Sequence, residues 1–475
     1  MVFNGIFFLL YFLPVFLIVY YLLPSSWRNY WTLLCSLLFY AWGAPKYVFF
    51  LLASTIANYY ITRILHNADK DAIKKRWLIL SVMLSLGLLV LFKYTNFIVA
   101  NFNIFLSNIH AGPVSWHAIA LPIGISFCTF HSISYSIDVY RKIRPPCDRL
   151  TDYMLYIFLF PKLVAGPIVR FNVIADEISD RKRNETASNV LKGLMRFTIG
   201  LSKKVLIANI LGYYADLIYN VPADTHDSLS ILLGTIAYSF QIYFDFAGYS
   251  DMAIGLGKMI GFSFPENFIA PYISRNITEF WRRWHITLMT FMRDYLYVPL
   301  CAGGRVKTKF HLLFNLWLVF LISGLWHGAN WTFLAWGAYH GLFLIVDRLF
   351  YKKLSAKLGL LSVLINYLVV LFSWIIFRSD SIQHIGDIMQ GIFRFTANTG
   401  TEFFSARFWI ILGCGVFFSF APLHKKGSQL MERIHDVTLS FRGMLVLSGV
   451  CIVLLIVSIS SIIASGFNPF IYFRF

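Results

Sequence analysis

Long apolar runs recur along almost the whole chain and dominate its pattern. A helix needs about 20 mostly apolar residues to cross the hydrocarbon core of a membrane, and residues 76–97 (RWLILSVMLSLGLLVLFKYTNF) form one of the clearest such runs. The strict alternation of a transmembrane barrel is missing, and we detect no internal repeat. The pattern predicts an all-α polytopic membrane protein with about eleven crossings plus re-entrant and interfacial helices. We expect one integral membrane domain over residues 1–475.

The predicted apolar segments are roughly 4–23, 29–43, 46–65, 77–97, 117–139, 151–168, 190–218, 229–260, 310–328, 331–350, 360–377, 407–421 and 443–464. The least apolar stretch, 378–406, is expected to be an extramembrane loop or an interfacial helix. Segment 153–169 contains Pro161, which can break a helix. Since basic loops flank this segment on both sides, we expect it to enter and leave on one face of the membrane.

Basic residues gather in short loops between the apolar runs, as in Lys70–Arg76 and in 141–149, 170–192, 348–357 and 424–442. Such loops face the cytoplasm. This distribution predicts a membrane protein whose N-terminus and C-terminus both lie outside the cytoplasm.

The composition narrows the class of protein further. The chain is 58% hydrophobic and only 13% charged, whereas soluble domains carry about 25% charged residues. The net charge of +18 is explained by the cytoplasmic loops, so we expect no nucleic-acid partner. The six cysteines are scattered without a C-x-x-C pair, and no third ligand accompanies the two histidines considered next. We therefore expect neither a metal site nor a bound cofactor.

Two histidines stand in segments that the pattern places at membrane depth. His285 lies in WRRWHITL and His327 in SGLWHGANW. Titratable groups are expensive there and are functional candidates by default, and imidazole moves protons near neutral pH. The alternative is a hydrogen-bonded histidine between helices, which is the interpretation we favour for His131 and His340.

Residues 238–304 are rich in polar side chains for a membrane protein, including Asp245 and Asp251. Such a segment cannot face lipid, so we expect it to line a cavity filled with water or substrate. The alternative is a network whose charges pair only with one another. Helical spacing would place Trp281 and Arg282 on the face of His285. Arg282 and Arg283 could bind an anionic group, or snorkel to lipid headgroups.

Several blocks together resemble the membrane-bound O-acyltransferases of the alginate and peptidoglycan O-acetyltransferase type. They are FYAWG at 39–43, FPKLVAGPI at 160–168, FQIYFDFAGYSD at 240–251, ENF at 266–268, WRRWHITL at 281–288, RDYLYVPL at 293–300 and SGLWHGANW at 323–331. The resemblance covers roughly residues 1–350. One departure is CAGG at 301–304, where a glycine/asparagine turn is expected.

The resemblance implies a set of helices around a central tunnel, with His327 as the catalytic base and His285 as its assistant. Asp245 and Asp251 match acidic positions near the tunnel, where a structural role is as plausible as a direct one. Trp326 and Asn330 accompany His327, and polar groups near His285 or Asn330 could stabilise the oxyanion.

The implied reaction moves an acetyl group from cytoplasmic acetyl-CoA, used as a substrate, across the membrane. A separate envelope transferase of the SGNH type would then acetylate a polysaccharide such as alginate or peptidoglycan. This chain itself contains no G-x-S-x-G element.

The chain ends in NPFIYFRF. The Phe-x-Tyr-Phe within residues 465–475 resembles the C-terminal motif of a small membrane peptide in teichoic-acid D-alanylation. That resemblance implies that the hydroxyl of Tyr472 carries the acyl group outside the membrane. The alternative is an aromatic anchor at the membrane surface.

Two other functions stay open from the residues alone. One is D-alanyl transfer to teichoic acid from a carrier protein. The other is a transporter or lipid flippase, which broken helices and buried charges would also fit, although it leaves both histidine motifs unexplained.

Overall fold

The computed structural model describes residues 1–302, 308–395, 404–436, 440–465 and 470. Every regular element in these ranges is a helix, which confirms the all-α prediction. The chain divides into two compact units. Unit 1 comprises Met1–Val190 and Leu256–Pro265, and unit 2 comprises Leu191–Gly255 and Glu266–Phe475. A single integral membrane domain remains a prediction.

Within the described residues, eight helical stretches are long and apolar enough to cross a membrane. They are Val48–Asn67, Asp71–Asn108, Ser228–Met259, Lys309–His327, Trp331–Leu358, Leu360–Arg378, Ala406–Leu423 and Arg442–Ala464. The chain is therefore a multi-pass membrane protein. The predicted eleven crossings would also need shorter helices, such as the apolar stretch Phe8–Leu22.

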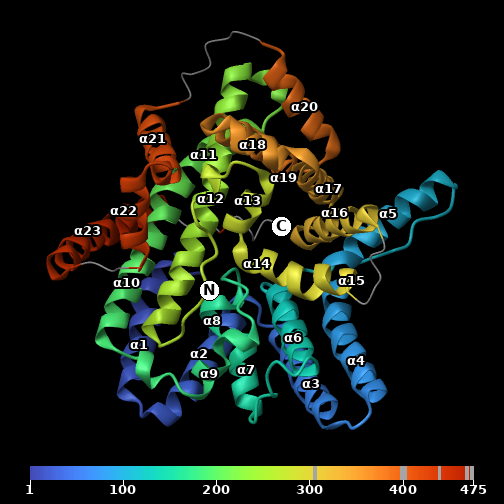
Figure 1. The fold of residues 1–475 in the computed structure, drawn as a ribbon, viewed down its shortest axis with the longest axis vertical. Coiled ribbons are helices and arrows are strands. Elements are labelled where there is room, and N and C mark those ends of the chain that lie inside the picture. Colours follow the sequence, from blue (N-terminus) through green and yellow to red (C-terminus); the bar gives the residue numbers. More distant parts are fainter. Residues whose placement is uncertain (303–307, 396–403, 437–439, 466–469, 471–475) are drawn as a thin grey trace. The chain divides into compact units, whose positions relative to one another are not determined.

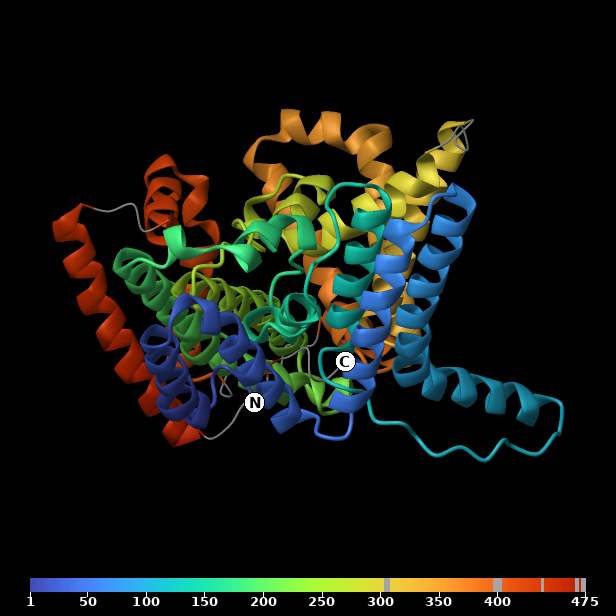
Figure 2. The same cartoon turned by 90° about the horizontal axis from the view of Figure 1, so that it is seen from below.

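Unit 1 carries most of the amino-terminal helices (Figure 1). They are α1 (Leu13–Leu22), α2 (Ser25–Gly43), α3 (Val48–Asn67), α4 (Asp71–Leu89), α5 (Thr95–Asn108), α6 (Ile125–Tyr140), α7 (Leu150–Phe158), α8 (Phe160–Leu163) and α9 (Phe171–Ser179). Figure 2 shows α5 extending away from the neighbouring α4, and α5 has no buried residue.

Helices α3, α4 and α6 pack side by side through small polar side chains (Figures 1 and 2). The Ser81 hydroxyl donates to Asn58 Oδ1 over 2.7 Å and lies 2.6 Å from the Ser136 hydroxyl. Asn58 in turn donates to Ser85 over 3.2 Å. Membrane helices associate in this way, since small residues permit close approach and lipid offers polar groups no partner.

The predicted break near Pro161 is confirmed. Helix α7 ends at Phe158, and the four-residue helix α8 begins at Phe160 with proline in its first turn, where a missing N–H costs nothing. Whether this segment enters and leaves on one side of the membrane stays a prediction.

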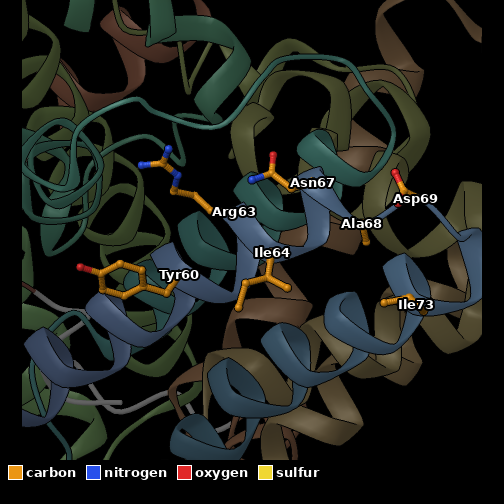
Figure 3. Close-up of a pocket in the computed structure, with 7 residues that line it drawn as sticks. All are labelled: Tyr60, Arg63, Ile64, Asn67, Ala68, Asp69 and Ile73. Carbon is orange, nitrogen blue, oxygen red and sulfur yellow. The ribbon is translucent and has the colours of Figure 1, made fainter.

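A surface groove of about 520 Å³ lies in unit 1 where α3 ends and α4 begins (Figure 3). It is lined by Tyr60, Arg63, Ile64, Asn67, Ala68, Asp69 and Ile73. None of the predicted site residues is among them.

Unit 2 contains the remaining helices. They are most of α10 (Ala187–Ser202), α11 (Asn209–Tyr219), most of α12 (Ser228–Met259), α13 (Ile277–Arg283), α14 (Ile286–Phe291), α15 (Val298–Cys301), α16 (Lys309–His327), α17 (Trp331–Val346), α18 (Lys352–Leu358), α19 (Leu360–Arg378), α20 (Ile382–Phe393), α21 (Ala406–Phe420), α22 (Lys425–Asp436) and α23 (Phe441–Ser465). Within the stretch 378–406, expected to be a loop or an interfacial helix, residues Ile382–Phe393 form α20, which buries Ile388, Gly391 and Ile392.

Two close helix contacts position the chemistry in unit 2. A Cβ added to Gly200 of α10 would lie 2.5 Å from the carbonyl oxygen of Gly248 in α12. A Cβ on Gly324 of α16 would lie 2.2 Å from the carbonyl oxygen of Phe333 in α17. Side chains larger than hydrogen do not fit at either place, so glycine lets these backbones touch. The contact between α10 and α12 brings Arg196 close to Asp251. The contact between α16 and α17 lies near His327, the last residue of α16.

Candidate active site

His327 is the last residue of α16 and is buried. Its ring centroid lies 4.9 Å from that of Trp326, 5.0 Å from Trp336 and 5.5 Å from Phe377. These side chains come from α16, α17 and α19, which lie together in Figure 1. The imidazole therefore sits at a helix end inside an aromatic cage.

His285 lies in a turn between two short helices. Helix α13 ends at Arg283, Trp284 is extended, and His285 has φ 45° and ψ 50° before α14 begins. This left-handed conformation is uncommon for residues other than glycine. The prediction that Trp281 and Arg282 share a helical face with His285 is wrong, because the helix stops before His285. Trp281 packs instead against Trp336 with a centroid distance of 5.6 Å.

The His285 ring is completely buried among aromatic side chains. Its centroid lies 4.6 Å from that of Phe246, 6.3 Å from Trp326 and 6.5 Å from Phe268. Burial lowers the pKa of His285 to about 3, because an imidazolium ion would lose its hydration. The ring is thus neutral at physiological pH. Since Trp326 contacts both rings, the two predicted histidines belong to one aromatic cluster.

The two ring nitrogens of His285 differ in hydrogen bonding. Nδ1 lies 3.1 Å from Oδ1 of Asn267. Nε2 is buried and has no hydrogen-bond partner within the part of the chain that the structure describes. Buried polar atoms are normally bonded, so such an atom calls for an explanation. A substrate group or a water molecule would satisfy it.

The two predicted aspartates of α12 form ion pairs with residues that precede α12 in the chain. Asp251 Oδ1 lies 2.7 Å from a guanidinium nitrogen of Arg196, and its Oδ2 lies 2.6 Å from Lys203 Nζ. Asp245 Oδ1 lies 2.7 Å from Lys204 Nζ, and both residues are buried. The alternative that the charges of residues 238–304 pair only with one another is therefore wrong, because these basic partners come from outside that segment.

These three basic residues were missed by the sequence analysis. Arg196, Lys203 and Lys204 interrupt the predicted apolar segment 190–218. Charged residues inside a membrane segment usually face the protein interior and pair there. That rule could have identified them as partners of carboxylates, although it could not have said which.

A cavity of about 480 Å³ opens in unit 2 beside the histidine cluster. Its walls are Lys203, Tyr243, Phe244, Ala247, Asp251, Glu266, Phe268, Ile269, Ala270, Ile273, Arg283, Phe418, Pro422, Ser428, Met431 and Glu432. The polar segment therefore lines a cavity, as predicted. Of these walls, Phe268 also contacts the rings of His285 and Trp284. Phe268 thus belongs both to the cavity wall and to the aromatic surroundings of His285.

The two arginines before His285 differ in position. Arg283 lines the cavity, and its guanidinium is 2.9 Å from the Glu279 carboxylate. Arg282 is exposed and is not part of the cavity wall. Of these two arginines, only Arg283 is in a position to contact a ligand in this cavity.

Asn330 caps the helix that follows His327. Its side chain accepts a hydrogen bond from the Thr332 N–H over 3.3 Å and donates to the Asp380 carbonyl over 2.9 Å. Asparagine is a preferred residue at this capping position. The amide oxygen thus caps α17, and the amide nitrogen joins this turn to Asp380, which follows α19. A role of Asn330 at an oxyanion stays a prediction.

Tyr472 lies outside the described residues. Phe470, two positions earlier, is buried, and its ring centroid is 4.8 Å from Tyr249 and 5.8 Å from Phe246. Phe246 is itself the nearest aromatic neighbour of His285. The chain thus approaches the histidine cluster to within one side chain at Phe470.

The chain is similar in sequence to known proteins. Residues 19–385 match the model of the membrane-bound O-acyltransferase family. A probable alginate O-acetylase from Pseudomonas aeruginosa is 43% identical over 83% of this chain and 75% of its own length. The peptidoglycan O-acetyltransferase of Helicobacter pylori is 37% identical over 82% and 80% of the two chains. The teichoic acid D-alanyltransferase of Bacillus subtilis is 31% identical over 55% and 70%.

Proposed function

Because the chain belongs to the membrane-bound O-acyltransferase family, we propose that this O-acyltransferase carries acetyl groups from cytoplasmic acetyl-CoA to a cell-envelope polysaccharide. Relatives named for alginate and for peptidoglycan acetylation support the acetyl group and the class of acceptor. The family assignment favours an O-acyltransferase over the alternative of a transporter or lipid flippase. The observation that carries the proposal is the cluster of two buried histidines around Trp326, which shares Phe268 with the wall of a cavity.

The cavity of about 480 Å³ is the proposed entrance for the thioester arm of the donor. Its volume is within the range of ligand pockets, which start at roughly 300 Å³. Arg283 and Lys203 in its wall would face the anionic end of the donor. The acetyl group would then pass Phe268 to reach the histidines.

His327 is the proposed general base. It takes the proton of the acceptor hydroxyl while the oxygen attacks the thioester carbonyl. The tetrahedral intermediate collapses, the C–S bond breaks, and the thiolate leaves with the proton that His327 had taken. The products are an O-acetyl ester and the free thiol, so no oxidant or further proton is needed. The aromatic cage keeps water away from the reacting centre.

Tyr472 is the proposed first acceptor. The burial of Phe470 against Tyr249 and Phe246 supports a tail that reaches the histidine cluster. An envelope transferase of the SGNH type would take the acetyl group from this tyrosine and pass it to the polysaccharide. The proposal requires an inner-membrane location with both termini outside the cytoplasm.

Acyl labelling of the purified protein with radiolabelled acetyl-CoA tests this function. We expect label on the wild type and none on His327→Ala or Tyr472→Phe. Label that persists in Tyr472→Phe would mean another acceptor, and label that persists in His327→Ala would refute the base assignment.

D-alanyl transfer is the second candidate, favoured by the Bacillus subtilis relative and the tail motif. The same assay is therefore repeated with a D-alanyl carrier protein as donor. Labelling from this donor and none from acetyl-CoA would replace the acetyl proposal.

A further inference from the structure

Asn267 is completely buried and binds the whole turn that carries His285. Its side-chain oxygen Oδ1 lies 3.1 Å from His285 Nδ1, 3.2 Å from the Thr287 backbone nitrogen and 2.9 Å from the Thr287 hydroxyl. Its backbone carbonyl accepts from the Ile286 N–H over 3.0 Å, and its Nδ2 donates to the Ser250 hydroxyl over 3.1 Å. The side chain and backbone of this one residue thus bond three consecutive residues, His285 to Thr287, and the side chain also bonds helix α12.

These bonds determine which ring nitrogen of His285 carries the proton. The Thr287 backbone N–H can only donate, so the amide atom that faces it must be the oxygen of Asn267. That oxygen can only accept, and Nδ1 of His285 must therefore carry the hydrogen. In a neutral imidazole the other nitrogen then holds a lone pair. Nε2, the buried nitrogen without a partner among the described residues, is thus a proton acceptor.

The same bonds hold an unusual backbone conformation. His285 has positive φ, which residues with a side chain adopt rarely. Such a conformation persists only where the surroundings determine it strongly, and it is concentrated at functional sites. Asn267 supplies bonds to the ring of the strained residue and to the two residues that follow it, from a segment 18 positions earlier in the chain.

We propose that Asn267 is the positioning residue of this O-acyltransferase: its amide fixes His285 as the Nδ1–H tautomer and presents Nε2 as a proton acceptor in the aromatic cluster. The inference rests on the proposed function of this cluster. It also changes the expected role of His285. In this tautomer the ring accepts a hydrogen bond from a reacting hydroxyl and cannot donate one to an oxyanion.

The decisive variant is Asn267→Asp, compared with Asn267→Ala. A carboxylate beside Nδ1 favours the imidazolium ion and raises the pKa of His285. Protonated His285 cannot accept, so Asn267→Asp should lose activity as the pH falls and recover it as the pH rises. Asn267→Ala leaves the tautomer free, and we expect kcat to fall roughly tenfold or more at every pH with little change in KM.

The matched control is Thr287→Val, which removes one donor to Asn267 and leaves its bond to His285. We expect a lower melting temperature and an unchanged pH profile. The inference is overturned if folded Asn267→Ala keeps the wild-type kcat, or if Asn267→Asp follows the wild-type pH profile.

A second readout does not depend on activity. In protein labelled with 15N-histidine, and with His285→Gln to assign the signals, His285 should show a protonated Nδ1 and an unprotonated Nε2, and Asn267→Ala should give a mixture. The opposite tautomer in the wild type would overturn the inference. If the tautomer is as expected while acetyl-CoA gives no transfer, the proposed donor has failed and the positioning role stands.

Discussion

Unit 2 treats its buried polar groups in two opposite ways. The carboxylates of α12 are closed into ion pairs, with Asp251 bonded to Arg196 and Lys203 and Asp245 to Lys204. The imidazole of His285 is neutral, enclosed by aromatic rings, and keeps one nitrogen without a partner among the described residues. Both arrangements reduce the free-energy cost of removing polar groups from water.

This difference distinguishes side chains that hold the structure together from side chains that can take part in the reaction. A buried charge is tolerated when an opposite charge and hydrogen bonds accompany it, and breaking such a pair is expensive. Groups held in this way are poor at exchanging protons, since each change of charge would leave a partner uncompensated. A neutral imidazole with a lone pair on one nitrogen can accept a hydrogen bond from a reacting group without breaking an ion pair. The aspartates thus join α12 to α10 and to the two lysines that directly follow α10. We assign the reaction to the histidines instead.

The largest effect is expected from His327→Ala. Loss of a general base lowers the rate typically 10²- to 10⁴-fold, and we expect acyl transfer to fall by about that factor while the protein stays folded. His340→Ala is the matched control, because His340 is also buried against Trp336 but has no role in the proposed reaction. It should lower the melting temperature and leave the rate per folded molecule near the wild-type value. Equal rate losses in the two variants would contradict the distinction drawn here.

The sequence allowed the residues of this site to be named but not their geometry. His285 and His327 stand out because charge and polarity are rare at membrane depth. The break after Arg283 could not be foreseen, since WRRWHITL reads as continuous helix and the left-handed turn depends on Asn267, a partner distant in the chain. Local pattern predicts local structure, whereas this turn is set by bonds from another segment.

The next largest effect concerns the buried ion pair between Asp245 and Lys204. Asp245→Leu leaves Lys204 buried without this counter-charge, and removal of one partner of a buried pair costs about 3–5 kcal/mol. We expect a large fall in the melting temperature of the detergent-solubilised protein. The double change Asp245→Leu with Lys204→Met removes both charges and should recover most of that loss. Failure of the double change to recover stability would mean that Asp245 acts through other contacts.

The fold was predictable in part for a related reason. Apolar runs gave the long helices of both units, and Pro161 marked the break between α7 and α8. Pairing across the α10–α12 contact was not predictable, because hydrophobicity places a segment in the membrane but says nothing about which helix it meets. Glycines such as Gly200 and Gly248 indicate that close contacts exist, and only the structure shows between which helices.

The smallest effect separates two adjacent arginines and tests the cavity itself. Arg283 lines the cavity, whereas Arg282 is exposed outside it. A partly exposed charge contact contributes up to about 1 kcal/mol, so Arg283→Gln should raise the KM for the thioester donor by no more than about fivefold. Arg282→Gln should leave the KM unchanged within experimental error.

Because Arg283 also pairs with Glu279, Glu279→Gln serves as a second control that breaks the pair and keeps the positive charge in the wall. It should affect the donor KM less than Arg283→Gln does. If instead Arg282→Gln raises the donor KM and Arg283→Gln does not, the donor approaches over the exposed face of α13. The cavity beside Phe268 would then not be the entrance of the donor. The contrast between the ion-paired aspartates and the histidines would be unaffected.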